Sequence, residues 1–170
     1  MIKVTSKVKI LVFTEGTILM HHNGDSKQRE EIVKQVINKE SPVKEYHRYI
    51  PIGNAVEKLK TWKNQDAEIL YLTSRRKPEE IEQIKNALKK HSFPEGQLLF
   101  RQKDEKYKDV VEKFVPDALI EDDCESIGGV DEMTITHVKA EIKKKIKSIP
   151  VKEFGGIDHL PDNLNELLAY

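Results

Sequence analysis

The feature that most restricts the fold of this chain is a regular alternation of short apolar runs with longer amphipathic stretches. Short runs rich in β-branched residues are typical of buried strands, whereas apolar residues three and four positions apart are typical of helices. Strands are predicted at 8–13, 67–74, 97–101, 117–123 and 133–138, with a further short strand near 149–151. Helices are predicted at 25–40, 54–64, 77–91 and 105–114, with helical stretches at 139–147 and 162–170.

This order of elements predicts the α/β class. Strands that alternate with helices are joined by right-handed crossovers, which give a mainly parallel sheet covered by helices on both faces. With 170 residues, the chain has the length of one domain with a full core. We therefore expect a single three-layer, Rossmann-like domain over residues 1–170.

The stretch 20–49 interrupts the alternation, because it separates the first strand from the helix at 54–64. An insertion at this point would lie over the C-terminal edge of the sheet, where open α/β folds bind their ligands. We expect a small, cap-like helical insertion at 20–49, and an ordinary helical hairpin on the surface is the alternative.

Composition excludes several classes of protein. Lys plus Arg and Asp plus Glu both number 29, so the net charge is zero and gives no general attraction to nucleic acid or to a membrane surface. The lysine-rich stretch 139–147 is typical of a solvated helix face, so nucleic acid is not an expected partner. No apolar run approaches the roughly 20 residues that span a bilayer, and no signal peptide is recognisable. The single cysteine, Cys124, suits a reducing compartment, and we expect a cytoplasmic protein of unassigned oligomeric state.

Polar clusters follow three of the predicted strands, at 14–17, 73–76 and 121–123. Taken singly, each has an ordinary explanation: a hydroxyl after a strand often caps a helix, and acidic residues are usually solvated. If the three strands are neighbours in a parallel sheet, however, the clusters meet at one edge. Their recurrence at strand ends favours a binding or catalytic site.

The order of these clusters resembles the haloacid dehalogenase-like (HAD) phosphohydrolase superfamily. That family has a first-strand motif hhhDxDGT, a Thr or Ser after the second strand, a Lys on a later helix and paired acids after the fourth strand. The stretches "VFTEGTI", "ILYLTSR" and "DALIEDDCESIGG" are similar to the first, second and fourth of these. The resemblance covers about residues 8–130.

In that family, a carboxylate attacks phosphorus, and a second acid two residues later transfers a proton. The resemblance implies a phosphorylated substrate, with Thr73, Ser74 and either Lys106 or Lys108 binding the phosphoryl group. It also implies that Asp122 and Asp123 bind Mg²⁺, which prefers carboxylate and water oxygens.

The first motif departs from the family pattern, because no aspartate stands at the position of the nucleophile. If Gly16-Thr17 is aligned with the Gly-Thr of the motif, Glu15 matches the second acid and Phe13 the nucleophile. If the strand is aligned instead, Thr14 matches the nucleophile and Gly16 the second acid. We prefer the first alignment, because a Gly-Thr turn has a fixed backbone shape and Glu15 then keeps an acid in place. The magnesium site also loses one expected ligand.

Three functions remain open on this sequence. The first is a phosphatase relative that binds a phosphorylated small molecule or Mg²⁺ without the aspartyl nucleophile. The second is an active HAD-type phosphohydrolase with an atypical nucleophile, in which Glu15 is the catalytic residue. The third is a non-catalytic interaction module with a vestigial site.

Overall fold

The structure, a computed structural model, describes residues 6–22, 29–38 and 44–170. In these ranges the main sheet has five strands in the order β5-β4-β1-β6-β7, and all of its pairings are parallel. This sheet confirms the predicted three-layer α/β class. Its strands are β1 (Lys9–Phe13), β4 (Glu68–Leu72), β5 (Gln97–Leu99), β6 (Ala118–Asp122) and β7 (Lys147–Val151).

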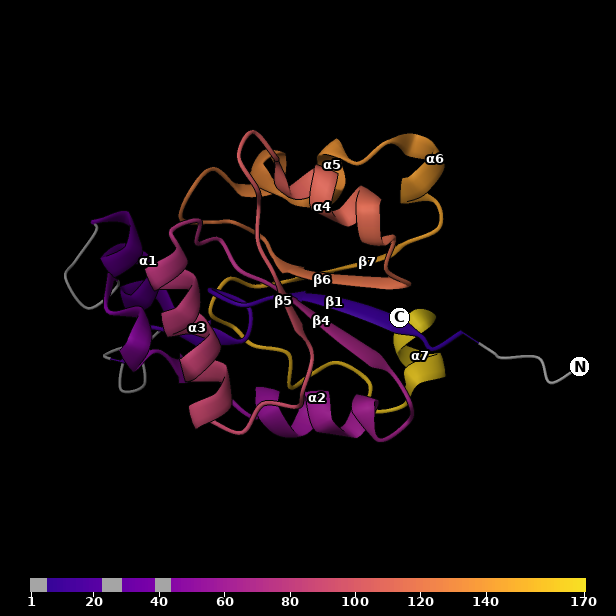
Figure 1. The fold of residues 1–170 in the computed structure, drawn as a ribbon, viewed down its shortest axis with the longest axis horizontal. Helices are drawn as coiled ribbons and strands as arrows, with labels where there is room; N and C mark the ends of the chain where they lie inside the picture. The colour runs from indigo at the N-terminus through magenta and orange to yellow at the C-terminus, as the bar shows by residue number, and fades with distance from the viewer. Residues whose placement is uncertain (1–5, 23–28, 39–43) are drawn as a thin grey trace, which may run out of the picture.

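Helices cover both faces of this sheet (Figure 1). Side chains alternate between the two faces of a strand, so Ile10 and Val12 of β1 belong to one hydrophobic cluster and Leu11 and Phe13 to the other. The first cluster includes residues of α2 (Ala55–Lys63), α3 (Pro78–Lys90) and α7 (Leu164–Leu168). The second includes residues of α4 (Tyr107–Phe114) and α5 (Thr134–His137), and α6 (Ala140–Lys143) packs against it.

The bounds of α3 follow from its sequence. Pro78 occupies the first helical position, where its missing N–H costs no hydrogen bond and its fixed φ suits the helix. Glu79 and Glu80 lie in the first turn and Lys89 and Lys90 in the last, as the helix dipole favours. The predicted helix at 77–91 is thereby confirmed.

The strand predicted at 133–138 is wrong, because residues Thr134–His137 form the short helix α5. The buried carboxylate of Glu121 accepts hydrogen bonds from the backbone N–H groups of Thr134 (2.6 Å) and Ile135 (3.1 Å), which begin this helix. The apolar residues Met133, Ile135 and Val138 still face the core, but from a helical turn. The fifth strand is instead β7, which includes the short strand predicted near 149–151. The helix α6 fills only part of the stretch 139–147.

The segment between β1 and α2 begins and ends with a two-stranded antiparallel ribbon, β2 (Leu19–Met20) and β3 (Ile50–Pro51). Between them lie α1 (Arg29–Ile37) and the short 3₁₀ helix η3 (Tyr46–Arg48). Figure 1 shows these elements at the end of the sheet where β1 finishes. The helix predicted at 25–40 begins and ends outside the described residues, and α1 is its described part.

After β7, the C-terminal segment of the chain packs alongside α2. Trp62 of α2 is fully buried, and its indole N–H donates to the carbonyl of Pro161 (2.9 Å). The Lys58 ammonium donates to the carbonyl of Leu160 (2.6 Å), and Asp158 accepts from the N–H of Asn54 (2.9 Å). These contacts fix the last helix, α7, over the same face of the sheet as α2. None of the helices within the described ranges has the length and apolar character needed to cross a membrane.

Candidate functional site

The three polar clusters lie at one edge of the sheet. β1 is hydrogen-bonded to β4 on one side and to β6 on the other, all in parallel, so the three strands end together. The hydroxyl of Thr73 donates to Glu15, and the hydroxyl of Thr17 donates to Asp122 (3.1 Å). The loops after β1, β4 and β6 are therefore in direct contact.

The carboxylate of Glu15 is the centre of this edge. Its Oε1 accepts from the Thr73 hydroxyl (2.5 Å), and its Oε2 accepts from the backbone N–H of Ser74 (3.2 Å). The hydroxyl of Thr14 also donates to Oε2, and Nε of Arg75 lies 3.8 Å from Oε1. The Glu15 side chain is 14% exposed. A carboxylate this far buried needs such donors, because desolvation of an ionised group is costly.

Neither candidate for the nucleophile position offers a reactive group to solvent. Phe13 ends β1, and its ring packs edge-to-face on Tyr107 with centroids 5.1 Å apart. Thr14 is fully buried and does not line the cavity described below. Its hydroxyl is already bonded to Glu15.

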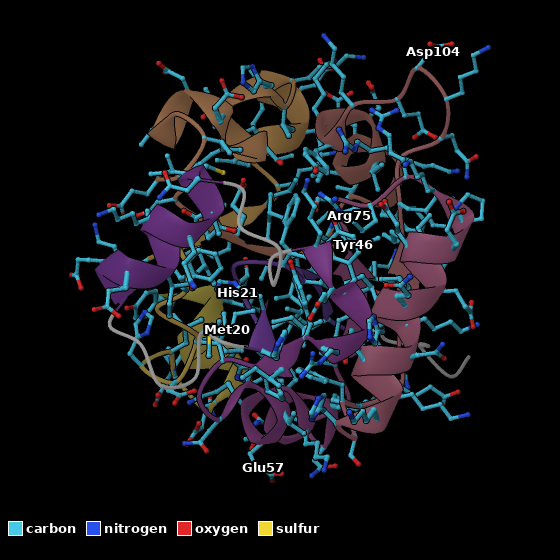
Figure 2. All side chains as sticks on the ribbon, turned by 90° about the vertical axis from the view of Figure 1, so that its left-hand side faces the viewer. Met20, His21, Tyr46, Glu57, Arg75 and Asp104 are labelled. Carbon is cyan, nitrogen blue, oxygen red and sulfur yellow. The ribbon has the colours of Figure 1, made fainter. Side chains whose placement is uncertain are left out.

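Arg75 joins the loop after β4 to the segment between β1 and α2. Its guanidinium donates to the hydroxyl oxygen of Ser74 through Nε (3.2 Å) and Nη2 (3.0 Å), and through Nη1 to the hydroxyl of Tyr46. It also lies 4.7 Å from the centre of the Tyr46 ring, a cation–π distance. Figure 2 looks onto this edge and shows Arg75 and Tyr46 side by side near its centre. Arg101 supports the same loop by donating to the carbonyl of Ser74 (3.0 Å).

The paired aspartates face different partners. Asp122 accepts from the Thr17 hydroxyl and from the N–H of Cys124 (2.9 Å), and burial raises the pKa of this carboxyl. Asp123 accepts from the N–H of Glu153 (3.1 Å), and its other oxygen is 3.5 Å from the Lys152 ammonium.

Two more buried carboxyls lie nearby. Burial raises the pKa of Glu121 to about 7, although its two backbone N–H partners on α5 act in the opposite direction. Glu153 is held by the hydroxyl (2.7 Å) and the N–H (2.8 Å) of Ser126, and burial raises its pKa as well. Both therefore retain a proton more readily than an exposed glutamate.

These loops and the segment between β1 and α2 enclose a cavity of about 440 Å³. Basic and hydroxyl-bearing side chains meet at one part of its lining, among them Ser74, Arg75 and Tyr46. The lining also includes aromatic and acidic residues: Phe13, Tyr49, Tyr107, Phe154, Glu15, Glu121, Asp122, Glu132 and Glu153. Lys44 and His21 also contribute to the lining.

Comparisons with solved structures identify the fold. A class C acid phosphatase from Bacillus anthracis with tungstate bound superimposes with a TM-score of 0.54 at 18% identity, covering 91% of this chain and 70% of that one. A second structure of class C acid phosphatase from Bacillus anthracis gives 0.53 at 17% identity, covering 98% and 80%. A Pnkp1/Rnl/Hen1 complex gives 0.54 at 16% identity, covering 87% of this chain and 47% of that one. The sequence matches no protein-family model and no curated protein.

The chain has the fold of the class C acid phosphatases. These phosphatases are members of the HAD superfamily. At this level of identity, the likeness shows the acid phosphatase fold alone.

Within this acid phosphatase fold, the two lysines assigned to the phosphoryl group lie apart from the cavity. Neither Lys106 nor Lys108 is among its lining residues. Lys106 is exposed at the N-terminus of α4, and the Lys108 ammonium lies 3.5 Å from Asp109. The basic side chains that do line the cavity are Arg75 and Lys44.

The residues assigned to Mg²⁺ do not fit this ion. Magnesium requires near-octahedral oxygen ligands, but the oxygens of Asp122 and Asp123 are directed to different protein donors. In the part of the chain that the structure describes, no three His, Cys, Asp or Glu side chains are grouped to hold a metal ion. Phe13 also supplies no ligand where the family has a carboxylate.

Sequence reasoning named Thr73, Ser74, Glu15 and Asp122, and the structure brings all four to one edge of the sheet. It gave no role to Arg75, Arg101 or Tyr46. Arg75 had a signal, because it directly follows the Thr-Ser pair at a strand end. Arg101 and Tyr46 reach the site only through tertiary contacts that no local pattern encodes.

Proposed function

We propose that this protein is a non-hydrolysing relative of the phosphatases whose fold it shares, and that it binds a phosphorylated small molecule in the cavity at the C-terminal edge of the sheet. The observation that carries the proposal is Phe13 at the last position of β1, where the HAD resemblance places the attacking carboxylate. A phenyl ring has no lone pair with which to attack phosphorus. Covalent catalysis of the usual kind therefore has no nucleophile.

Binding is supported by the donors at the Arg75 end of the cavity. A guanidinium presents several N–H groups in a plane and suits phosphate oxygens, and Arg75 is already oriented by Ser74 and Tyr46. The Ser74 side chain and Lys44 add further donors to the lining. The rings of Tyr46 and Tyr49 offer an apolar wall for the organic part of a ligand, as is common in small-molecule sites.

Several carboxyls also line the cavity, and most of them are directed to donors within the protein. Glu121 accepts from two N–H groups of α5, Asp122 from Thr17 and Cys124, and Glu153 from Ser126. Hydrogen bonds of this kind reduce the charge that a carboxylate presents to a ligand. The Arg75 end therefore remains the favoured position for a phosphoryl group.

The proposal is tested by two assays on the purified chain. A chromogenic phosphate monoester, with and without Mg²⁺, should give no turnover above the buffer blank. A panel of phosphorylated sugars and nucleotides should include compounds that raise the melting temperature, because a ligand that binds only the native state stabilises it. If the native chain shows turnover and Glu15→Gln abolishes it, the protein is an active phosphohydrolase and the proposal is wrong. A panel without any shift would remove the binding half of the proposal.

A pair of variants locates the binding. Arg75→Gln removes the guanidinium from the cavity and should abolish the ligand-induced shift. Lys108→Gln removes a positive charge outside the cavity, so the ligand-induced shift should remain. The reverse result would place the phosphoryl group near α4, as the family pattern implies.

A further inference from the structure

We propose that Glu15 is a built-in competitor for the phosphoryl group, whose carboxylate occupies the donors that an incoming phosphate would use. The inference deepens the proposed function and depends on it for the identity of the ligand. Inorganic phosphate should bind weakly to the native chain, and binding should require the Glu15 side chain to leave its place.

The first support is the direction of the Thr73 hydroxyl. Its oxygen accepts from the backbone N–H of Arg75 (3.1 Å), which leaves its single proton for donation to Glu15 (2.5 Å). Thr73 is fully buried, and its hydroxyl is held between the N–H of Arg75 and the carboxylate of Glu15. The donor that the HAD resemblance assigns to a phosphoryl oxygen therefore binds a carboxylate oxygen of the same chain.

The second support is the set of donors as a whole. Both Glu15 oxygens are used: one contacts Thr73 and lies near Arg75, and the other contacts the N–H of Ser74. A hydroxyl, a backbone N–H and a guanidinium converging on two oxygens of an anion form the kind of arrangement that also binds phosphate. With Glu15 in place, these groups already have an anionic partner.

The third support is the turn that directs Glu15. Gly16 follows it with φ +82°, and a Cβ at this glycine would lie 3.1 Å from Oδ2 of Asp122 and 3.5 Å from Glu153. The loop after β1 is therefore packed against β6 and the loop after β7, which limits its movement. Glutamate has one methylene more than the aspartate of the family motif, so its carboxylate extends further from this fixed turn.

A tethered competitor lowers apparent affinity in a predictable way. The observed dissociation constant equals the intrinsic one divided by the fraction of molecules whose site is open. If Glu15 occupies the donors in roughly nine molecules of ten or more, its removal should tighten phosphate binding by about tenfold or more. A phosphate ester that also contacts Tyr46 and Tyr49 gains further binding energy with which to displace it.

The experiment measures binding of inorganic phosphate, and separately of tungstate, by isothermal titration calorimetry. Glu15→Ala should bind both oxyanions at least about tenfold more tightly than the native chain. The double variant Glu15→Ala/Thr73→Val should lose this gain, because the hydroxyl donor is then missing.

Glu80→Ala is the matched control. Glu80, in the first turn of α3, is another carboxylate whose charge acts on Arg75, but no contact joins it to the Thr73 hydroxyl in the described hydrogen bonds. Removing its charge should change phosphate affinity less than Glu15→Ala does. Equal gains in the two variants would show a general charge effect and would overturn the proposal.

Further outcomes also decide the question. If Glu15→Ala binds phosphate no better than the native chain, or if the double variant keeps the gain, the proposal is wrong. If Glu15→Ala does not fold, Glu15→Asp takes its place, since its shorter side chain withdraws from Thr73 and should give a smaller gain of the same sign. The two proposals can fail separately, because a Thr73-dependent gain in phosphate binding would stand even if no phosphate ester bound the native chain.

Discussion

The Thr73 hydroxyl donates a 2.5 Å hydrogen bond to the carboxylate of Glu15 and thereby joins the loops that follow two neighbouring strands, β4 and β1. Both ends of this bond are shielded from water, Thr73 fully and Glu15 largely. Hydrogen bonds to charged groups contribute more than neutral ones, and a buried partner left without its donor is costly. The bond is therefore expected to stabilise the fold as well as to define the site.

Replacing Thr73 by valine should lower the free energy of unfolding by about 1.5–3 kcal/mol, because Glu15 loses a donor while the volume of the side chain is retained. Thr73→Ser keeps the hydroxyl and removes only a methyl group, so it should cost about 1 kcal/mol. Urea denaturation followed by circular dichroism measures both. Equal losses in the two variants would mean that the hydroxyl contributes nothing.

Phe13→Asp should lower the free energy of unfolding by about 3–5 kcal/mol, since it removes a buried ring that packs on Tyr107 and introduces a carboxyl among apolar side chains. Phe13→Leu, which keeps an apolar side chain, should cost about 1 kcal/mol. The same denaturation experiment compares them. A Phe13→Asp variant as stable as Phe13→Leu would show that this position already tolerates a charge.

The same Phe13→Asp variant should remain without phosphatase activity. An attacking carboxylate alone does not supply the metal ligands or free the donors that Glu15 occupies. Hydrolysis of a chromogenic ester in the presence of Mg²⁺ is the measurement, under conditions in which circular dichroism shows a folded variant. Turnover restored by this single change would show that the rest of a catalytic site is complete.

Glu121 should make stability depend on pH. Burial raises the pKa of Glu121 from 4.5 to about 7, so the folded state retains its proton between these values while the unfolded state loses it. Its contribution is fully present below about pH 4.5 and is lost as the pH rises through about 7. The free energy of unfolding that Glu121 contributes and that is lost across this window is about 3 kcal/mol.

Glu121→Gln should remove most of this pH dependence, because its amide does not titrate. Chemical denaturation near pH 4.5 and near pH 7 measures how steeply the free energy of unfolding changes with pH. Glu57→Gln, a change at an exposed glutamate of α2, should keep the slope of the native chain. If Glu121→Gln keeps the native slope too, the titrating group lies elsewhere.

Leu167→Ala should lower the free energy of unfolding by about 2–5 kcal/mol, since Leu167 is fully buried in the cluster that joins α7 to α2. Leu168→Ala, at the partly buried neighbour, should cost about 1 kcal/mol. Thermal and urea denaturation would detect the difference. Equal effects would indicate that α7 is not docked through Leu167.

The elements predicted from the sequence are those that local pattern determines. The helix at 77–91 has its proline, its charges and its apolar spacing in one stretch, and the structure places α3 there. The four strands at 8–13, 67–74, 97–101 and 117–123 are short apolar runs, and each corresponds to a strand of the parallel sheet. The sequence left open whether these strands are neighbours, and the sheet order, with β1 between β4 and β6, brings their ends together.

What the sequence could not supply depends on partners far along the chain. The stretch 133–138 has the alternation of a strand, and only the carboxylate of Glu121, from another element, caps its first turn as a helix. The placement of Lys106 and Lys108 away from the cavity depends on how α4 packs on the sheet. The contact of Glu15 with Thr73 requires the side-chain reach of a glutamate across two loops, which no motif describes.

Trp62 gives this molecule an optical reporter. It is the chain's single tryptophan. Its ring, on α2, is fully buried, and its N–H donates to the carbonyl of Pro161 in the C-terminal segment. Because no other indole contributes, intrinsic fluorescence should come mainly from this one layer of the protein. A red shift of the emission would therefore signal that the α2–α7 layer has opened, whatever happens at the opposite face of the sheet.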